Sequence, residues 1–381
     1  MKTFKVNIFS FIYAATCAAI FVIAGCDKIP LSYDRTGQDS QTEKKPQTPK
    51  NPANSPQTPQ QPAGSPQQPP QSPPASGLPA PTAYTWYVSQ GGSDAAGGQS
   101  PSEPLATVQA ALSAIKTSHR GGSWPAGKSA TIVISGEIKA PGQFKDSMID
   151  ISGVGNYPPI VFEGDPVAGG TLNANMRQSG DGRVMSVTNN KVTLGGNLLL
   201  TGGRALWGGA VCVGAKLPNT AGELVIAGAE ISGNTGQVGG GVLVYEGSVS
   251  MTSGAIRNNS GGYTKSGASS GGGIHLNFFT FLLMSGGTIA DNGNGSLSTE
   301  SGGGLSIDGN AYALMTGGEI INNFAKDSGG GVNISPMGNF KMTGGLINGN
   351  KVTSGNNDVA MNRQYGSVFT QTGGTVGVIS Q

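Results

Sequence analysis

The chain has 381 residues, of which 64 are glycine and 23 are proline, while 12% are charged and the formal net charge is +2. A nucleic-acid binder normally carries a strongly basic face, and each interior glycine costs a helix about 1 kcal/mol relative to alanine. These values therefore exclude a nucleic-acid-binding protein and a helical bundle. Thirteen prolines lie between Pro46 and Pro81, whereas 60 glycines follow position 90, so composition separates a linker from a folded body.

The first 25 residues have the pattern of a secretory signal peptide. Lys2 and Lys5 form a short basic region, and an apolar run follows from Ile8 to Ala24. The run is close to the shortest membrane-spanning helix, so an uncleaved membrane anchor is the alternative. The next residues, Ile-Ala-Gly-Cys ending at Cys26, resemble the lipobox of bacterial lipoproteins. That resemblance implies cleavage after residue 25 and lipid attachment at Cys26.

The resemblance to lipoproteins also predicts where the protein is found. It implies a bacterial cell-envelope protein that contacts the membrane through the lipid on Cys26, with the outer membrane or cell surface favoured. Asp27 resembles an inner-membrane retention signal of some bacteria, so the inner membrane is the alternative. Cys17 would leave with the signal peptide, and Cys212 would remain as a single thiol, so no internal disulfide is expected.

Residues 26–82 are predicted to be a disordered tether. The segment is polar at first and then rich in proline, glutamine and serine, with almost no apolar side chains to bury. A polyproline II chain extends about 3.1 Å per residue, so the Pro-rich stretch over residues 51–81 would hold a folded body up to roughly 100 Å from the bilayer.

The rest of the chain contains internal repeats. Five segments open with two or three glycines and an alternating apolar pair: GGAVCV, GGGVLV, GGGIHL, GGGLSI and GGGVNI. A second signature follows in each unit: IAGAEISGN, MTSGAIRNN, MSGGTIADN, MTGGEIINN and MTGGLINGN. Within a unit the apolar residues recur every second position, which is the period of a β-strand. Each unit therefore predicts three short strands separated by turns.

Tandem units of this kind bury their apolar sides by stacking one turn of chain on the next. The spacing predicts an all-β fold, a right-handed parallel β-helix, with regular repeats over residues 184–381. Propellers and leucine-rich horseshoes have longer or leucine-based repeats and are excluded. The stacked inward side chains of two successive turns are expected to be Val242, Val244, Val249, Met251 and Ile256 on Ile274, Leu276, Leu282, Met284 and Ile289.

One asparagine recurs three positions after the last inward aliphatic residue of each repeat. We expect these side chains to adopt left-handed turn geometry and to bond one another as a structural ladder. The predicted ladder consists of Asn234, Asn259, Asn292, Asn323 and Asn350.

Residues 83–183 are predicted to hold an N-terminal cap and less regular turns. A strand near Tyr87 is followed by a Gly/Ser/Pro loop and by apolar residues at helical spacing over about 105–117. An exposed β-helix end presents unpaired backbone groups, so the short helix is expected to cap the first turn.

Two family resemblances follow from these segments. The opening YVSQGGSDAAGGQSPSEPLATVQAALSAI resembles that of pectin-lyase-like proteins, and the Gly-Gly-Gly-Ile elements resemble a repeat motif of chlamydial polymorphic outer-membrane proteins. The second motif of the latter family, Phe-x-x-Asn, has isoleucine in place of phenylalanine here. The pectin-lyase resemblance implies that a lyase on this fold would use a carboxylate cluster to hold calcium and a basic residue to remove a proton. The repeats of this chain contain no convincing stack of acidic residues.

The sequence assigns no catalytic residue, metal ligand or cofactor. The best acidic cleft pairs Glu246 with Asp308, with Asn277 between them, and a solvated face is the simpler interpretation. Cys212 and His275 are expected to be outward strand positions. The ligand-contact candidates, an aromatic strip at the turns with one histidine, are Trp207, Tyr245, His275, Phe278, Phe279 and Tyr312.

These features predict a lipid-anchored surface module that binds a glycan or a host or envelope protein, in the manner of an adhesin. Two alternatives stay open: an envelope enzyme acting on polysaccharide, of lyase type, and a structural surface antigen. Turnover of a glycan separates the first two classes.

Overall fold

The computed structural model describes most of the chain from Tyr84 onward. The predicted signal peptide, Cys26 and the predicted tether lie outside the described residues, and the boundaries proposed for them stay predictions. The described ranges are 84–122, 124–140, 146–176, 182–215, 219–262, 269–294, 299–361 and 363–381.

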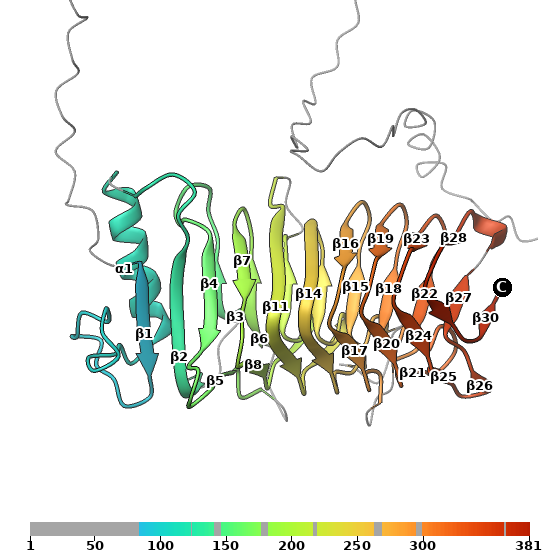
Figure 1. The fold of residues 1–381 in the computed structure, drawn as a ribbon, viewed down its shortest axis with the longest axis horizontal. Helices are drawn as coiled ribbons and strands as arrows, with labels where there is room; N and C mark the ends of the chain where they lie inside the picture. The colour runs from blue at the N-terminus through green and yellow to red at the C-terminus, as the bar shows by residue number, and fades with distance from the viewer. Residues whose placement is uncertain are drawn as a thin grey trace, which may run out of the picture. The chain divides into compact units, whose positions relative to one another are not determined.

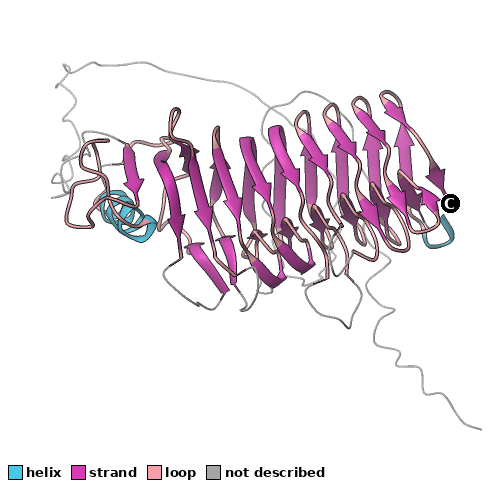
Figure 2. Cartoon of the chain, turned by 90° about the horizontal axis from the view of Figure 1, so that it is seen from below, coloured by secondary structure: helices cyan, strands magenta, loops and turns pink. Residues whose placement is uncertain are grey.

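The chain coils into a right-handed parallel β-helix, as the repeats predict (Figure 1). Each turn of chain crosses a first face, bends sharply onto a second face, and returns along a third face before the next turn begins. Strands of successive turns lie side by side on every face (Figure 2). The helix lies at one end of this coil, beside the first strand, and Gln381 lies at the other end.

The first face carries the longest run of paired strands. Its strands are β1 (Thr85–Ser89), the first half of β2 (Ala130–Lys139), β4 (Ile160–Gly164), β7 (Lys191–Leu194), the first halves of β11 (Gly222–Ser232) and β14 (Gly247–Arg257), β16 (Phe281–Met284), β19 (Tyr312–Met315), β23 (Asn339–Met342) and β28 (Val368–Gln371).

The second face continues the same sheet, because β2, β11 and β14 bend around the corner and pair on both sides of it. Its other strands are β5 (Gly170–Asn173), β8 (Leu198–Thr201), β17 (Thr288–Ala290), β20 (Glu319–Ile321), β24 (Leu346–Asn348) and β29 (Thr375–Val376).

The third face is a separate sheet, and it positions the candidate site. Its strands are β3 (Asp146–Ile151), β6 (Gly182–Val187), β10 (Val211–Val213), β13 (Val242–Val244), β15 (Ile274–Leu276), β18 (Leu305–Ile307), β22 (Val332–Ile334), β27 (Val359–Met361) and β30 (Ile379–Ser380). Short elements at the corners are β9 (Arg204–Trp207), β12 (Thr235–Val238), β21 (Phe324–Ala325), β25 (Lys351–Val352), β26 (Gly355–Asn356) and the 3-10 helix η2 (Arg363–Tyr365).

The core consists of inward side chains that stack from turn to turn, and the predicted stacking is confirmed. Every member of the predicted set is buried. Full burial of one such aliphatic side chain contributes about 1.5–3 kcal/mol, and stacking lets each turn cover its neighbour. The registered inward pairs are Val242 with Ile274, Val244 with Leu276, Val249 with Leu282, Met251 with Met284 and Ile256 with Ile289.

The predicted helix is present as α1 (Val108–Arg120). The Thr107 side chain caps its N-terminus by accepting a hydrogen bond from the Ala110 backbone N–H at 3.1 Å. The buried residues of α1 are Val108, Ala111, Leu112 and Ile115, which belong to the same apolar core as β1. Its role as a cap stays a prediction. Within the described part of the chain no helix is long and apolar enough to span a membrane.

Glycine is required where the coil turns its corners. Gly287, between β16 and β17, has a φ of 81°, and a Cβ there would lie 2.6 Å from Met251 Cε. Gly272, before β15, has no room either, because a Cβ would collide with the carbonyl oxygen of Gly303 in the next turn. The repeated glycines therefore allow both the left-handed backbone and the close approach of successive turns.

The five asparagines form a buried ladder along the corner between the second and third faces. Each side-chain amide donates to the Oδ1 of the next member at 2.9–3.1 Å, and Asn350 donates to Asp358 Oδ1 at 2.8 Å. The predicted left-handed geometry is wrong for these residues. The positive φ angles belong to the preceding positions, Gly233, Asn258, Asp291, Asn322 and Gly349, because the chain turns one residue before the side chain enters the ladder.

Candidate functional site

Outward side chains of the third face form a single row that crosses seven turns. Parallel pairing without a register shift over this stretch keeps equivalent positions side by side. The row begins with polar residues, continues with two apolar ones and ends with polar ones, so it has two separate polar parts. The row runs Asp150, Ser186, Cys212, Leu243, His275, Ser306 and Asn333.

A cavity of about 380 Å³ opens at the N-terminal half of this row. Strands β3, β6 and β10 supply its floor, and the corners before β10 and after β13 supply its aromatic walls. The lining residues that carry chemistry are Asp146, Asp150, Arg183, Trp207, Cys212 and Tyr245.

Two aromatic rings meet at the cavity edge. Trp207 and Tyr245 pack edge to face, with ring centroids 6.4 Å apart and an interplanar angle of 87°. Trp207 is 45% exposed, although an indole of its size normally buries most of its surface. The pair therefore presents apolar ring surface to whatever enters the cavity.

One guanidinium lies beside these rings. Arg183 Nε donates to the Trp207 carbonyl oxygen at 3.0 Å, and a terminal nitrogen donates to Ser186 Oγ at 3.1 Å. The same nitrogen lies 3.9 Å from Asp146 Oδ1. These contacts fix the Arg183 head in the floor of the cavity, where its side chain is only 13% exposed.

The two carboxylates of the cavity come from β3. Asp146 begins the strand with a φ of 71°, a left-handed conformation, and its side chain is 86% exposed. Asp150 is also exposed and accepts a hydrogen bond from Ser152 Oγ at 3.1 Å. An ion pair with so exposed a partner contributes little to stability, so the Asp146 carboxylate keeps most of its capacity to accept hydrogen bonds from a ligand.

Cys212 lies at the base of the cavity, and its side chain is buried rather than partly exposed. Burial raises the pKa of the Cys212 thiol, and the nearby Arg183 opposes that effect. The thiol donates a weak hydrogen bond to the Gly214 carbonyl oxygen at 3.5 Å. A protonated, buried thiol is a poor nucleophile, so Cys212 serves as a packing residue.

The second half of the row contains a group of polar side chains centred on His275. Ser270 Oγ lies 2.9 Å from Nδ1 of His275, and Nε2 lies 3.4 Å from Oδ2 of Asp308. The imidazole points outward from the strand, as predicted, but it is only 2% exposed because its neighbours enclose it. Burial lowers the pKa of His275, with the Asp308 charge opposing, and the ring is therefore neutral at pH 7.

The Asp308 carboxylate is held by two more hydroxyls. Ser335 Oγ donates to Asp308 Oδ1 at 2.7 Å, and Ser306 Oγ donates to the same oxygen at 3.4 Å. Asn333 continues the network, because its amide donates to Ser335 Oγ at 3.2 Å and its Oδ1 accepts from Ser328 Oγ at 3.0 Å.

The predicted aromatic strip is divided between different places. Trp207 and Tyr245 line the cavity, whereas Phe278 and Phe279 lie on the turn between β15 and β16 and are 54% and 79% exposed. Tyr312 is on the first face, where its ring stacks on Phe281 at 5.6 Å. Burial raises the pKa of the Tyr312 phenol.

The predicted acidic cleft is not formed. Glu246 Oε2 accepts hydrogen bonds from the Thr220 backbone N–H at 3.0 Å and from the Thr220 hydroxyl at 2.7 Å. Asp308 contacts His275 and accepts hydrogen bonds from two serines. The two carboxylates thus have separate partners. Over the described residues no cluster of three or more His, Cys, Asp or Glu side chains has metal-binding geometry.

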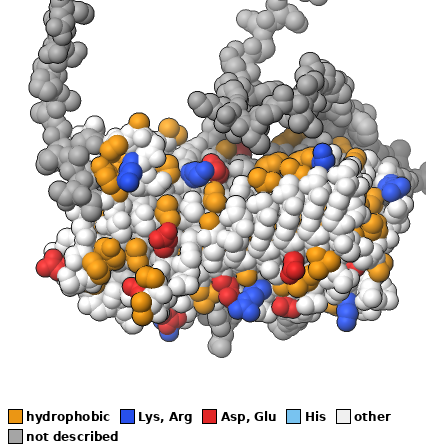
Figure 3. Space-filling model, viewed as in Figure 1, with side chains coloured by type: hydrophobic (Ala, Val, Ile, Leu, Met, Phe, Trp, Pro, Cys, Tyr) orange, Lys and Arg blue, Asp and Glu red, His pale blue; other side chains and the backbone are white. Residues whose placement is uncertain are grey.

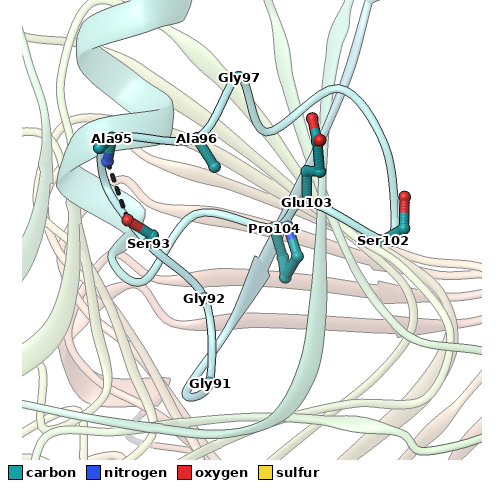
Figure 4. Close-up of a pocket in the computed structure, with 9 residues that line it drawn as sticks. All are labelled: Gly91, Gly92, Ser93, Ala95, Ala96, Gly97, Ser102, Glu103 and Pro104. Carbon is teal, nitrogen blue, oxygen red and sulfur yellow. Dashed lines mark hydrogen bonds between the residues drawn. The ribbon is translucent and has the colours of Figure 1, made fainter.

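A second cavity, of about 520 Å³, lies within the loop between β1 and α1 (Figure 4). Its wall is made mostly of glycine, alanine and serine, and Glu103 is its one carboxylate. The loop is closed by Asp94, which accepts hydrogen bonds from the Ala106 and Thr107 backbone N–H groups at 2.9 Å. It offers no aromatic surface and no converging charges. We therefore place the candidate site on the third face.

The structure adds residues to the site that sequence reasoning missed. Asp146, Asp150 and Arg183 belong to turns that precede the clear repeats, where no motif fixes the register. Ser270 did leave a signal, because a serine precedes the Gly-Gly-Gly element in three successive repeats, at Ser270, Ser301 and Ser328. The bridges between these serines show that they form a row of their own.

Comparisons with protein-family profiles, with curated proteins and with solved structures find no match to this chain. The fold itself, a parallel β-helix, is shown by the strand pairing. The resemblances to pectin-lyase-like proteins and to chlamydial polymorphic proteins gain no support beyond that fold. Figure 3 shows one face of the coil, on which a few charged side chains lie among hydrophobic side chains and the white of the other side chains and the backbone.

Proposed function

We propose that this chain is a lipid-anchored protein of the bacterial cell envelope that displays its β-helix as a binding module. The ligand would occupy the third-face cavity. The observation that carries the proposal is the Trp207–Tyr245 pair, which lines one cavity of about 380 Å³ together with the exposed carboxylates of β3. Small-molecule sites are typically concave, within roughly 300–1,000 Å³, and combine apolar walls with a few polar groups.

A saccharide is the ligand class that this lining fits best. The C–H face of a sugar ring packs on an aromatic ring, and the Trp207 indole offers such a surface. Sugar hydroxyls donate hydrogen bonds to carboxylates, and Asp146 and Asp150 are exposed acceptors. A glycan of the host or of the envelope would therefore bind with rings against Trp207 and hydroxyls toward β3.

The remaining parts of the proposal rest on the sequence. A lipid on Cys26 would hold the chain at a membrane, and stable anchoring needs more than one acyl chain, which the lipoprotein resemblance supplies. The Pro-rich tether over residues 26–82 would let the β-helix work away from its own bilayer. Such an arrangement suits an adhesin-like surface protein.

Glycan binding by the purified full chain tests the ligand class. Trp207→Ala and Tyr245→Ala should each weaken binding of a glycan at least about tenfold, which is about 1.4 kcal/mol. Phe278→Ala is the matched control, because Phe278 is an exposed aromatic residue outside the cavity. Unchanged binding in both cavity variants, or an equal loss in the control, would exclude the cavity as the site.

Lipid attachment is tested separately in cells. Metabolic labelling with an alkyne-bearing fatty acid should mark the wild-type protein and leave Cys26→Ala unlabelled. Protease treatment of intact cells should release the β-helix if it is displayed at the surface. A labelled Cys26→Ala variant would overturn the anchor, and protection from protease in intact but not in permeabilised cells would overturn the surface location.

Two rival functions give different results in the same assays. A polysaccharide lyase would release unsaturated products that absorb ultraviolet light when the chain is incubated with polygalacturonate and calcium, and such absorbance would refute the binding-module proposal. A structural surface antigen would be displayed at the cell surface and bind no glycan.

A further inference from the structure

The two neighbours of the His275 ring determine which of its nitrogens carries the proton. The Asp308 carboxylate only accepts, so the imidazole Nε2 must carry the proton that points toward Asp308 Oδ2. In a neutral ring Nδ1 is then the acceptor, and the Ser270 hydroxyl donates to it across 2.9 Å. Ser270, His275 and Asp308 thus form a relay in which each group orients the next.

The surroundings favour the protonation state that a general base needs. His275 is buried, and burial holds its pKa below the ordinary value of 6.5, so the ring is free of charge at pH 7. Ser306 and Ser335 donate to the Asp308 oxygen that does not face the imidazole, and they keep this carboxylate in place. A neutral imidazole held by a fixed carboxylate is ready to accept a proton from a neighbouring hydroxyl.

Equivalent positions in other turns show what is special about this one. The bond from Ser328 Oγ to Asn333 Oδ1, at 3.0 Å, spans the same corner two turns later, so the coil itself places a serine beside the outward row. In the preceding turn the same two positions are Val238 and Leu243, and Leu243 is buried. The fold therefore does not need polar side chains at these two positions. Only in the turn of Ser270 is the serine paired with a base, His275.

We propose that Ser270 is a nucleophilic serine, activated by His275 and positioned through Asp308, that takes an acyl group from a carboxylic ester. The serine lies within hydrogen-bond reach of the base, and the carboxylate that would orient the base lies 3.4 Å from the other ring nitrogen, a longer contact than an ordinary hydrogen bond. The two ring nitrogens have swapped roles relative to the common triad, because here Nδ1 faces the serine and Nε2 faces the carboxylate. The half-buried Ser270 hydroxyl precedes Gly271, whose φ of 67° turns the chain sharply at this point.

Hydrolysis of the ester through an acyl-serine needs no reactant other than water. Ser270 Oγ attacks the ester carbonyl carbon while its proton passes to Nδ1 of His275. The bond between that carbon and the alcohol oxygen then breaks, and the alcohol takes the proton back from Nδ1. Water attacks the acyl-serine in the same way, which releases the carboxylic acid and restores the Ser270 hydroxyl.

Acylation of Ser270 and hydrolysis of the acyl-serine should both be slow. The backbone N–H groups of Ser270 and Gly271 donate to the carbonyl oxygens of Gln237 and Ser301 and are not directed at a bound substrate. Stabilisation of an oxyanion by such donors usually contributes about 10²–10³ in rate, and these two groups do not supply it. Covalent labelling of the serine is therefore the most direct readout. The proposal does not depend on the glycan site.

The test uses the purified full chain and a small biotinylated fluorophosphonate, which forms a phosphorus–oxygen bond to an activated serine and releases fluoride. Peptide mass spectrometry should locate the label at Ser270, and Ser270→Ala should abolish it. Ser301→Ala and Ser328→Ala are matched controls, because these serines occupy the same row without a histidine beside them. Labelling spread equally over the three serines, or no labelling of the wild type, would overturn the proposal.

Two further variants assign the roles of the other groups. His275→Leu reproduces the Leu243 position of the preceding turn and should cut the labelling rate at least about 100-fold while the circular dichroism spectrum is unchanged. Asp308→Asn should keep labelling but change its pH profile, because Asp308 acts through the imidazole. Release of p-nitrophenol from p-nitrophenyl acetate gives the acyl readout. Undiminished labelling in folded His275→Leu would refute activation by the ring.

Discussion

At the scale of single residues, the asparagine ladder concentrates buried polar groups. Asn292 donates from Nδ2 to Asn323 Oδ1 and to the Ile256 carbonyl oxygen, and its Oδ1 accepts two hydrogen bonds from Asn259. Asn292→Ala removes all four and leaves buried groups without partners, each of which costs about 1–3 kcal/mol. We expect a loss of about 3 kcal/mol in the free energy of unfolding, measured by urea denaturation.

A nearby asparagine provides the control for that measurement. Asn348 is exposed and lies outside the ladder, so Asn348→Ala should change the free energy of unfolding by less than about 0.5 kcal/mol. Equal effects of the two substitutions would mean that the ladder contributes no special stability.

His275 makes stability depend on pH. Because its pKa in the folded chain lies below the ordinary 6.5, the unfolded chain binds a proton at higher pH than the folded chain does. The charged group that faces the ring is Asp308, Ser270 contacts Nδ1, and Leu243 and Ser306 are the neighbours of His275 on the adjacent strands. Stability from this residue is present above about pH 6.5 and is lost as pH falls below that value, by up to about 1.4 kcal/mol per pH unit until the folded pKa is reached.

Melting temperatures of the wild type and of Ser270→Val/His275→Leu, recorded between pH 7.5 and pH 5, check this dependence. The double variant copies Val238 and Leu243 of the preceding turn and should show a flatter profile over that interval. Parallel profiles would show that another group is responsible.

At the scale of elements, the turns between the third and first faces share one backbone conformation. The positive φ angles in three successive turns belong to Phe279, Asn310 and Met337, at 60°, 58° and 64°. Asparagine tolerates this region, whereas a bulky side chain there is strained by roughly 1–2 kcal/mol. Phe279→Asn should therefore stabilise the protein by about 0.5–1 kcal/mol in thermal unfolding, because the exposed ring loses little burial.

Phe278 serves as the comparison in that experiment. Its φ is not positive, and its ring lies against Gly309, where a Cβ would collide with it. Phe278→Asn should be neutral or destabilising. If Phe279→Asn also fails to stabilise, the strain at position 279 is offset by contacts of its ring.

The strands were predictable because each of them repeats. The registered core from Val242 to Ile289 follows from alternation and from the spacing of the glycine elements, and one repeat was enough to define the next. The cavity was not predictable in the same way. Asp146 and Arg183 come from β3 and β6, where no repeat signature precedes the strands, and Trp207 meets Tyr245 across a corner.

The burial of His275 was also outside the reach of periodicity. Alternation places the side chain on the outer surface correctly, since Ile274 and Leu276 point inward. What encloses the ring is the serine five residues earlier and the aspartate of the next turn. Contacts between corners and neighbouring turns depend on three-dimensional register, which a strand pattern does not contain.

At the scale of the whole molecule, the coil behaves as a linear array in which each turn contacts its neighbours. Ser270 and Ser301 occupy equivalent positions, and each pairs with the same row in the next turn. Deleting residues 271–301 joins Ser270 to Gly302 and lets Asn259 face Asn323, so core, glycine corners and ladder keep their register. We expect this variant to unfold cooperatively at a moderately lower temperature, because a solenoid loses roughly one repeat and one interface.

A smaller deletion should be far more damaging. Removing residues 271–286 joins Ser270 to Gly287 and brings β17, a second-face strand, to the position of the third-face strand β15. Inward and outward side chains no longer match those of neighbouring turns, so burial and pairing fail together. Thermal unfolding of both variants, followed by circular dichroism, tests this expectation. If the variant lacking residues 271–286 unfolds as cooperatively as the variant lacking residues 271–301, stability does not depend on register between turns.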